Sequence, residues 1–185
     1  MIRSEIRTII ESINPLDALE ATHQAQALDW IDSGAGLFRT QKPATPDPHL
    51  VSYFIVIDRA AGKILLVDHK NARLWLPSGG HVEPNEHPLV TVEREVVEEL
   101  NMQASFFSET PLFITVTPTV GVTAGHTDVS LWYVLLSDAD VPIQFDEHEF
   151  FGVRWFAPDE IPYARADPHL QRFVMKLNLV LDNLL

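Results

Sequence analysis

The segment from residue 75 to residue 102 limits the fold more than any other part of the sequence, because it predicts a helix with two different faces. It reads WLPSGGHVEPNEHPLVTVEREVVEELNM. One face of the expected helix, from about residue 87 to residue 100, is apolar and consists of Leu89, Val92, Val96 and Leu100. Residues at this spacing form one stripe, so the helix is expected to pack on a sheet.

A second face of the same helix is acidic. Glu95, Glu98 and Glu99 stand at i, i+3 and i+4, so their carboxylates share about one turn and would repel one another if unpaired. Clustered oxygen ligands suit a hard cation such as Mg²⁺, with Mn²⁺ as the alternative. Gly79 and Gly80 precede the helix and let the backbone approach a ligand closely. The segment therefore predicts a divalent metal site.

The elements around this helix predict an α+β fold, arranged as a layered α/β/α sandwich. Strands are expected at residues 50–58, 63–69, 111–122, 127–136 and 153–156, the first two joined as a hairpin at Gly62. Asp167 and Pro168 are expected to begin a closing helix. Its apolar stripe consists of Leu170, Phe173, Val174, Leu177, Leu181 and Leu184.

The first 47 residues are predicted to be a helical extension followed by a proline-rich connector. The first helix carries a stripe of Ile2, Ile6, Ile9, Ile10 and Ile13. Asn14 and Pro15 are expected to cap a second helix that ends near Ser33 and Gly34, and the prolines of residues 41–48 predict an extended segment. Three roles stay open for these helices: a cap on the sandwich, a cover over the pocket, or the contact of a homodimer.

Composition excludes several classes of function. A formal charge of −13 would repel a long polyanion, so a long nucleic acid is not expected as a partner. The chain has no cysteine, which excludes disulfides, thiolate zinc sites and cysteine nucleophiles. No apolar run approaches the roughly 18 residues that cross a bilayer, and the start MIRSEIRTII lacks the pattern of a secretory signal. A cytoplasmic protein that acts on a small molecule, without membrane contact, is expected.

The charged segment resembles the Nudix box, G-x5-E-x7-R-E-U-x-E-E-x-G-U, where U is aliphatic. The positions in register are Gly80, Glu86, Arg94, Glu95, Val96, Glu98, Glu99 and Met102. One fixed position differs, since Asn101 stands where the family has a glycine that ends the helix in the left-handed conformation. Asparagine is the usual second choice for positive φ, so we expect the turn to persist.

The resemblance implies a Nudix-type sandwich with a mixed sheet over residues 48–185, and a Mg²⁺-dependent enzyme that hydrolyses the diphosphate linking a nucleoside to another group. It implies metal ligation by Glu95, Glu98, Glu99 and the Gly79 carbonyl. Glu86 and Arg94 would form a structural ion pair that holds the loop with Gly80 on the helix. The family's general base is a glutamate in the box or on a later loop. The candidates here are Glu98 and Glu149.

Three pairs of residues are weaker candidates for substrate binding, with loop packing or solvation as the alternative. His81 and Glu83 lie in the loop after the glycines and could contact phosphate or metal. The other two pairs are a phosphate clamp of Lys70 and Arg73, and a pocket wall of His126 and Asp128 on the side of a strand that also carries Ser130 and Trp132.

Three hypotheses about the function follow from the resemblance. A MutT-like nucleoside triphosphate pyrophosphohydrolase comes first, because the domain has no large recognition insert. An ADP-ribose or nucleotide-sugar pyrophosphatase comes second, because such relatives often carry a proline near the position of Pro118. A non-catalytic nucleotide-binding module comes third, because such modules typically lose box acids that this chain keeps.

Overall fold

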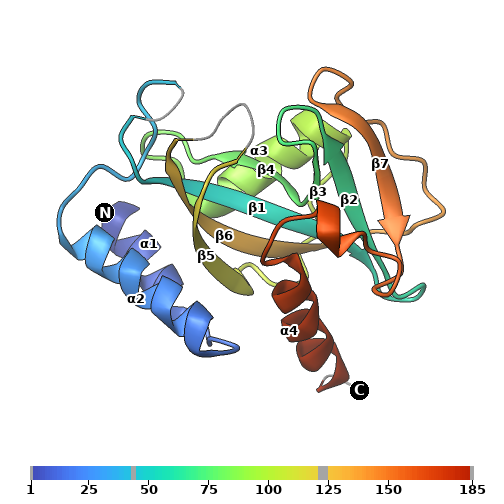
Figure 1. Cartoon of the computed structure of the whole chain (residues 1–185), viewed down its shortest axis with the longest axis horizontal. Coiled ribbons are helices and arrows are strands. Elements are labelled where there is room, and N and C mark those ends of the chain that lie inside the picture. Colours follow the sequence, from blue (N-terminus) through green and yellow to red (C-terminus); the bar gives the residue numbers. More distant parts are fainter. Residues whose placement is uncertain (1, 43–44, 121–124, 184–185) are drawn as a thin grey trace.

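The computed structural model describes residues 2–42, 45–120 and 125–183, and this part of the chain folds as one mixed sheet between helices (Figure 1). In chain order the elements are α1 (Ile2–Ser12), α2 (Ala18–Asp32), β1 (His49–Asp58), β2 (Lys63–His69), β3 (Leu74–Leu76), β4 (Ser78–His81), α3 (Pro88–Leu100), β5 (Phe113–Pro118), β6 (Thr127–Leu136), β7 (Phe150–Phe156), a 3₁₀ turn (Tyr163–Arg165) and α4 (Leu170–Asp182). This order confirms the predicted α+β class.

The sheet is built around β1. The strands lie in the order β3-β2-β1-β6-β5, while β4 pairs with β1 and β7 pairs with β2. β1 runs parallel to β6 from the pair His49–Asp128 onward and antiparallel to β2 and β4. β1 is buried along nearly its whole length, as is typical of a strand that is covered on both faces.

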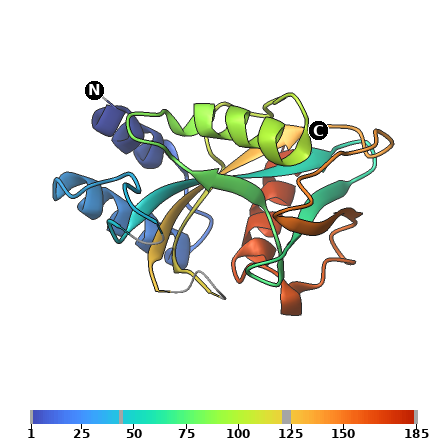
Figure 2. The ribbon, with the colours of Figure 1, turned by 90° about the horizontal axis from the view of Figure 1, so that it is seen from above.

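Helices cover both faces of the sheet, as the sandwich prediction required. α3 lies on one face and α4 on the other (Figure 2). Successive residues of a strand point to opposite faces, so β6 contributes to both layers. Its Leu131 and Tyr133 share the core under α3 with Val96, whereas Trp132 packs with Phe173 of α4.

The N-terminal helices share the core of the sheet. Ile6 and Ile10 of α1 and Ile31 of α2 belong to the same apolar cluster as the α3 side of the sheet, and α2 contacts the edge strand β5. A buried ion pair of 2.6 Å joins Glu20 of α2 to Lys176 of α4. The isoleucine stripe is therefore buried within this chain; the domain boundary near residue 48 stays a prediction.

Both predicted starts of the flanking helices are wrong. α2 begins at Ala18, because Asp17 rather than Asn14 caps it by accepting a hydrogen bond from the backbone N–H of Glu20. α4 begins at Leu170, because the Asp167 carboxylate accepts from the backbone N–H of His169 within the preceding turn. At α2 the capping side chain was placed about one turn too early, whereas α4 begins at a residue without a side-chain cap.

Other boundaries differ less. Gln41 and Thr45 form an antiparallel bridge, so the expected extended connector turns back on itself at its start. β5 is shorter than expected and β7 begins earlier, while β3 and β4 were not predicted. Residues 121–122 of the expected strand and Leu184 of the expected stripe lie outside the described residues. No helix in the described ranges is long and apolar enough to cross a membrane.

Candidate active site

A cavity of about 1190 Å³ lies beside α3 and β4, and charged side chains line much of it. The acidic lining includes Glu83, Glu95, Glu98, Glu99, Asp128 and Glu149. Arg39, Lys42 and Arg94 add positive charge to the same wall. Such a lining suits a charged ligand that binds together with counter-ions of the opposite charge.

Glu99 is the buried member of the acidic face of α3. Its side chain points toward β4, where the Ser78 hydroxyl and the Gly79 backbone N–H donate to the same carboxylate oxygen at 2.5 and 2.9 Å. Burial outweighs these hydrogen bonds and raises the pKa of Glu99 to about 8. A cation beside this carboxylate would keep it ionised at neutral pH.

Glu95 and Glu98 lie on the same face, toward the open side. One guanidinium nitrogen of Arg94 donates to Glu95 at 2.6 Å and to Glu98 at 3.4 Å. Burial raises the pKa of Glu95 despite this contact, and Glu98 is largely exposed. The three carboxylates thus run from a buried to a solvated end of one helical turn, and Arg94 is shared by the two outer ones, Glu95 and Glu98.

Close contacts with β1 and α3 require glycine at both Gly79 and Gly80 of β4. Gly79 has a φ of +140°, and a Cβ there would lie 2.2 Å from the carbonyl oxygen of Ser52 on β1. A Cβ on Gly80 would lie 2.0 Å from a carboxylate oxygen of Glu95. β4 can therefore approach both β1 and the acidic face of α3 only because these positions have no side chain.

Arg94 and Glu86 join the loop after β4 to α3. Two guanidinium nitrogens of Arg94 each lie 3.1 Å from the Glu86 carboxylate, which also accepts from the hydroxyl of Thr91 and the backbone N–H of Glu83. Burial acts to raise the pKa of Glu86, but these hydrogen bonds hold it below its usual value. A bidentate pair of this kind fixes orientation as well as distance.

The remaining candidates are divided between the cavity and its surroundings. Glu149 is exposed in the lining, on a loop held to α3 by the Asp146 backbone N–H, which donates to the carbonyl of Glu99 at 2.9 Å. Lys70 and Arg73 are not among the lining residues. The ammonium group of Lys70 donates to the carbonyl of Glu147.

His81, Glu83, His126 and Asp128 all line the cavity. Burial, with the charge of Arg39 second, lowers the pKa of His81 to about 3, so its ring is neutral. Trp132 lies further along the same side of β6, outside the cavity lining, where it is buried in the core against α4.

A comparison with family models matches residues 48–177 to the one described as the NUDIX domain. The chain belongs to the Nudix family. The matched range contains the glutamates of α3, β4 and most of the residues that line the cavity. As a Nudix enzyme the protein is a pyrophosphohydrolase, which hydrolyses acid anhydrides of phosphorus.

Solved structures of Nudix proteins share the fold at low sequence identity. A NUDIX-family hydrolase from Clostridium perfringens is 20% identical with a TM-score of 0.56, over 71% of this chain and 97% of that one. A MutT NUDIX hydrolase from Burkholderia pseudomallei is 22% identical with a TM-score of 0.51, over 69% and 95%. A C. elegans Ap4A hydrolase is 18% identical with a TM-score of 0.55, over 72% and 98%. A comparison with curated proteins finds no match.

Sequence reasoning missed three residues beside this Nudix site. Ser78 contacts Glu99, Arg39 donates to the ring of His81 at 3.0 Å, and His49 lies against both His81 and His126. A serine next to paired glycines was a usable signal for Ser78. His49 had no local signal, because only the parallel pairing of β1 with β6 brings it to Asp128.

Proposed function

We propose that this Nudix enzyme is a Mg²⁺-dependent nucleoside triphosphate pyrophosphohydrolase. The observation that carries the proposal is the graded acidic face of α3, in which a buried Glu99 and two more exposed glutamates border a large, charged cavity. Neighbouring carboxylates that repel one another in the partly buried wall of a cavity are typical of a cation site. A polyphosphate substrate would bind to the same cation.

The donor set of this wall fits Mg²⁺ or Mn²⁺. Glu95, Glu98 and Glu99 supply hard oxygen ligands, and Gly79 adds its backbone carbonyl in the proposal. The space that Gly80 leaves beside Glu95 supports this assignment, because a larger residue would displace the carboxylate. When bound, a divalent ion neutralises charge on the diphosphate and lowers the pKa of a bound water.

The chain's own residues would orient the substrate and accept a proton from the attacking water. Glu98 is the first candidate for the base, because it is the most solvated carboxylate of the acidic face. Glu149 is the second, because it is exposed in the same cavity on the opposite loop. Arg94 and Glu86 would act by holding the loop and α3 in register, without contacting the reacting atoms.

Substrate contacts are proposed for His81, Glu83, His126 and Asp128, all of which line the cavity. Lys70 and Arg73 were the proposed phosphate clamp, and they have less support because both lie outside the lining.

A second substrate class, ADP-ribose or a nucleotide sugar, has one observation in its favour: Pro118 lines the cavity. The solved relatives include a MutT protein, an Ap4A hydrolase and a dihydroneopterin triphosphate pyrophosphohydrolase from E. coli, which is 14% identical with a TM-score of 0.52, over 68% of this chain and 94% of that one. These relatives support a nucleotide-like diphosphate as substrate and do not favour one member of that class. The third hypothesis from the sequence, a silent binding module, does not fit a chain that belongs to the pyrophosphohydrolases. A cytoplasmic enzyme without a long nucleic acid as partner remains part of the proposal.

The test is an assay of purified protein with Mg²⁺ and a panel of nucleoside triphosphates, ADP-ribose, nucleotide sugars and dinucleoside polyphosphates, with both products identified by chromatography. The proposal expects a nucleoside monophosphate and pyrophosphate from a triphosphate. Turnover of ADP-ribose or sugar nucleotides alone would select the second class. Absence of Mg²⁺-dependent turnover across the panel would support a binding module. Size-exclusion chromatography with light scattering of the same sample tests the homodimer hypothesis.

A further inference from the structure

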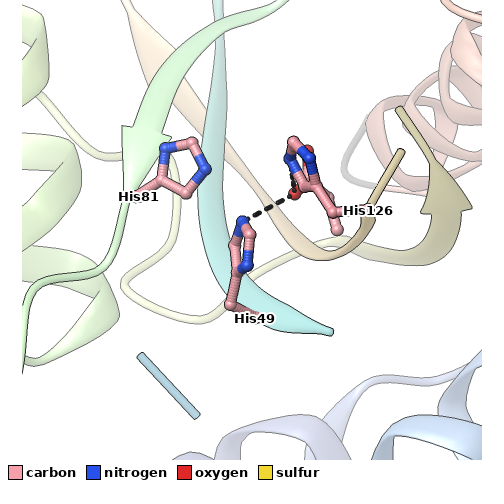
Figure 3. A group of neighbouring side chains, drawn as sticks. His49, His81 and His126 are labelled. Atoms are coloured by element: carbon pink, nitrogen blue, oxygen red, sulfur yellow. Dashed lines mark ion pairs between the residues drawn. The ribbon is translucent and has the colours of Figure 1, made fainter. Parts of the chain in front are cut away.

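Three histidines and an aspartate gather beside the cavity, where the ends of β4, β1 and β6 meet. His81 is the last residue of β4, His49 the first residue of β1, and His126 immediately precedes β6 (Figure 3). The strand pairs Val51–His81 and His49–Asp128 bring them together. One potential ligand atom from each of the four lies within 4.8 Å of the others, and among the described residues this is the one such group found.

Two inner atoms of this histidine cluster, one on His49 and one on Asp128, have no hydrogen-bond partner among the described residues. His49 is fully buried, and its Nε2 atom and the Oδ1 atom of Asp128 make no hydrogen bond within the described part of the chain. They approach one another at 3.3 Å without the angles of a hydrogen bond. Buried polar atoms are normally satisfied, so two such atoms facing each other call for a positive charge between them, which either a proton on Nε2 or a bound cation supplies.

Outer contacts place the lone pairs of two rings toward the centre of the cluster. The Nδ1 atom of His49 lies 2.7 Å from the carbonyl of Pro46, which can only accept, so Nδ1 carries the proton and Nε2 is free to bind. The Thr119 hydroxyl donates to the carbonyl of His126 at 3.1 Å, and in the tautomer with a protonated Nδ1 its oxygen accepts from that ring at 3.3 Å. This is the arrangement in which a second hydrogen bond fixes the tautomer of a metal-binding histidine.

Two of the distances among the inner atoms match those between ligands of a tetrahedral ion. Zinc with nitrogen and oxygen ligands at about 2.0–2.2 Å places neighbouring ligand atoms roughly 3.3–3.5 Å apart. The Oδ1 atom of Asp128 lies 3.3 Å from Nε2 of His49 and 3.4 Å from Nε2 of His126. Two edges of the tetrahedron are therefore already in place.

We propose that His49, His81, His126 and Asp128 form a site for a zinc-class transition metal ion, distinct in its ligands from the Mg²⁺ site on α3. In this role His81, His126 and Asp128 bind the metal ion in place of the substrate contacts proposed for them above. Imidazole suits such ions, whereas the all-oxygen glutamate face suits Mg²⁺, so ligand chemistry assigns the two ions to different sites. Arg39 donates to Nε2 of His81 at 3.0 Å and must turn away for that ring to become the fourth ligand. The ion would tie β4, β1 and β6 together beside the active site.

The test is a zinc titration of metal-stripped protein against a chromophoric chelator, with millimolar Mg²⁺ present to fill the glutamate site. Asp128→Asn keeps the shape of the side chain, and His126→Ala removes one ring. We expect one tight zinc equivalent in the wild type, and at least about a 100-fold loss of affinity in each variant, because loss of an outer partner alone often weakens metal binding 10- to 100-fold. Removing the competing cation with Arg39→Gln is expected to leave zinc binding at least as tight.

Two control variants separate this site from others. His148→Ala removes an exposed histidine outside the cluster, and Glu98→Gln alters the proposed Mg²⁺ site. Both are expected to keep the zinc equivalent, whatever happens to hydrolysis. Zinc binding that survives both cluster variants, or that is lost in Glu98→Gln, would overturn the proposal.

Thermal melting gives a readout that does not depend on activity. Zinc at about 100 times its Kd should raise the Tm of the wild type by roughly 5–10 °C, and the shift should vanish in Asp128→Asn. The metal-free melts of both variants show whether each is folded. If His126→Ala does not fold, the isosteric Asp128→Asn decides alone, and a Tm shift that it retains would contradict the site.

Discussion

Substitution by alanine is expected to have different effects at the two adjacent glycines of β4: a loss of stability at Gly79 and a weaker use of Mg²⁺ at Gly80. In Gly79→Ala the new Cβ would lie 2.2 Å from the backbone carbonyl oxygen of Ser52 and 2.8 Å from the Cα of Tyr53, and neither atom can move alone. The φ of +140° adds strain for any L side chain. Backbone strain of about 1–3 kcal/mol and overpacking of about 1–3 kcal/mol together predict a loss of about 4 kcal/mol. For a chain of this length that lowers the Tm by roughly 8–16 °C.

Gly80→Ala meets a different atom. Its Cβ would lie 2.0 Å from the Oε1 atom of Glu95, the far end of a flexible side chain that can rotate away. We expect a change in stability of at most about 1 kcal/mol, because only a rotamer has to change. The displaced carboxylate is a proposed metal ligand, so the Mg²⁺ concentration for half-maximal turnover should rise at least about 10-fold.

The assay measures thermal melting and the Mg²⁺ dependence of turnover for both variants. The reasoning is refuted if Gly79→Ala melts within about 2 °C of the wild type, or if Gly80→Ala keeps its Mg²⁺ half-saturation. A Gly80→Ala protein that fails to fold would show that the Glu95 side chain is fixed more rigidly than its position implies.

Three further predictions concern stability. Lys176→Met leaves the buried carboxylate of Glu20 without its cation and should lower the free energy of unfolding, measured in urea, by about 3–5 kcal/mol. Adding Glu20→Leu should recover most of this loss. Equal losses in the single and the double variant would contradict this. Asn101→Gly relieves a left-handed residue with a φ of 48° and should stabilise the protein by up to about 1 kcal/mol or leave it unchanged; clear destabilisation would refute the capping role. Burial raises the pKa of Asp167 to about 6, so its contribution to stability is complete below about pH 4 and declines as the pH rises through 6. Asp167→Asn should flatten the fall in the free energy of unfolding between these two pH values. An unchanged pH profile of stability would count against this.

The sequence was sufficient for the features that depend on local spacing. The apolar and acidic faces of α3 follow from helical periodicity, and the helix ends at Asn101 in the left-handed conformation that the substituted box position predicted. The hairpin of β1 and β2 at Gly62 followed from a turn residue between two apolar runs. Where one period and one turn residue decide the structure, the prediction was right.

Features that depend on pairing between distant segments could not be predicted. β4 contains two glycines, which disfavour an isolated strand, and it exists because β1 supplies its hydrogen-bond partners. Asp17 and Asn14 are both good helix caps, and the contacts of Glu20 with α4 favour the later start. The histidine cluster needs β1 to lie parallel to β6, a register that no local pattern of residues near His49 contains.

The central claim is that the acidic face of α3 holds the divalent ion used in hydrolysis. The most direct measurement is turnover of the best substrate against Mg²⁺ concentration for wild type, Glu98→Gln and Glu93→Gln. Glu93 is exposed on the same helix but does not line the cavity, so it is the matched control. We predict a roughly 10²- to 10⁴-fold loss for Glu98→Gln and wild-type behaviour for Glu93→Gln. Turnover of Glu98→Gln within about threefold of the wild type would contradict the account.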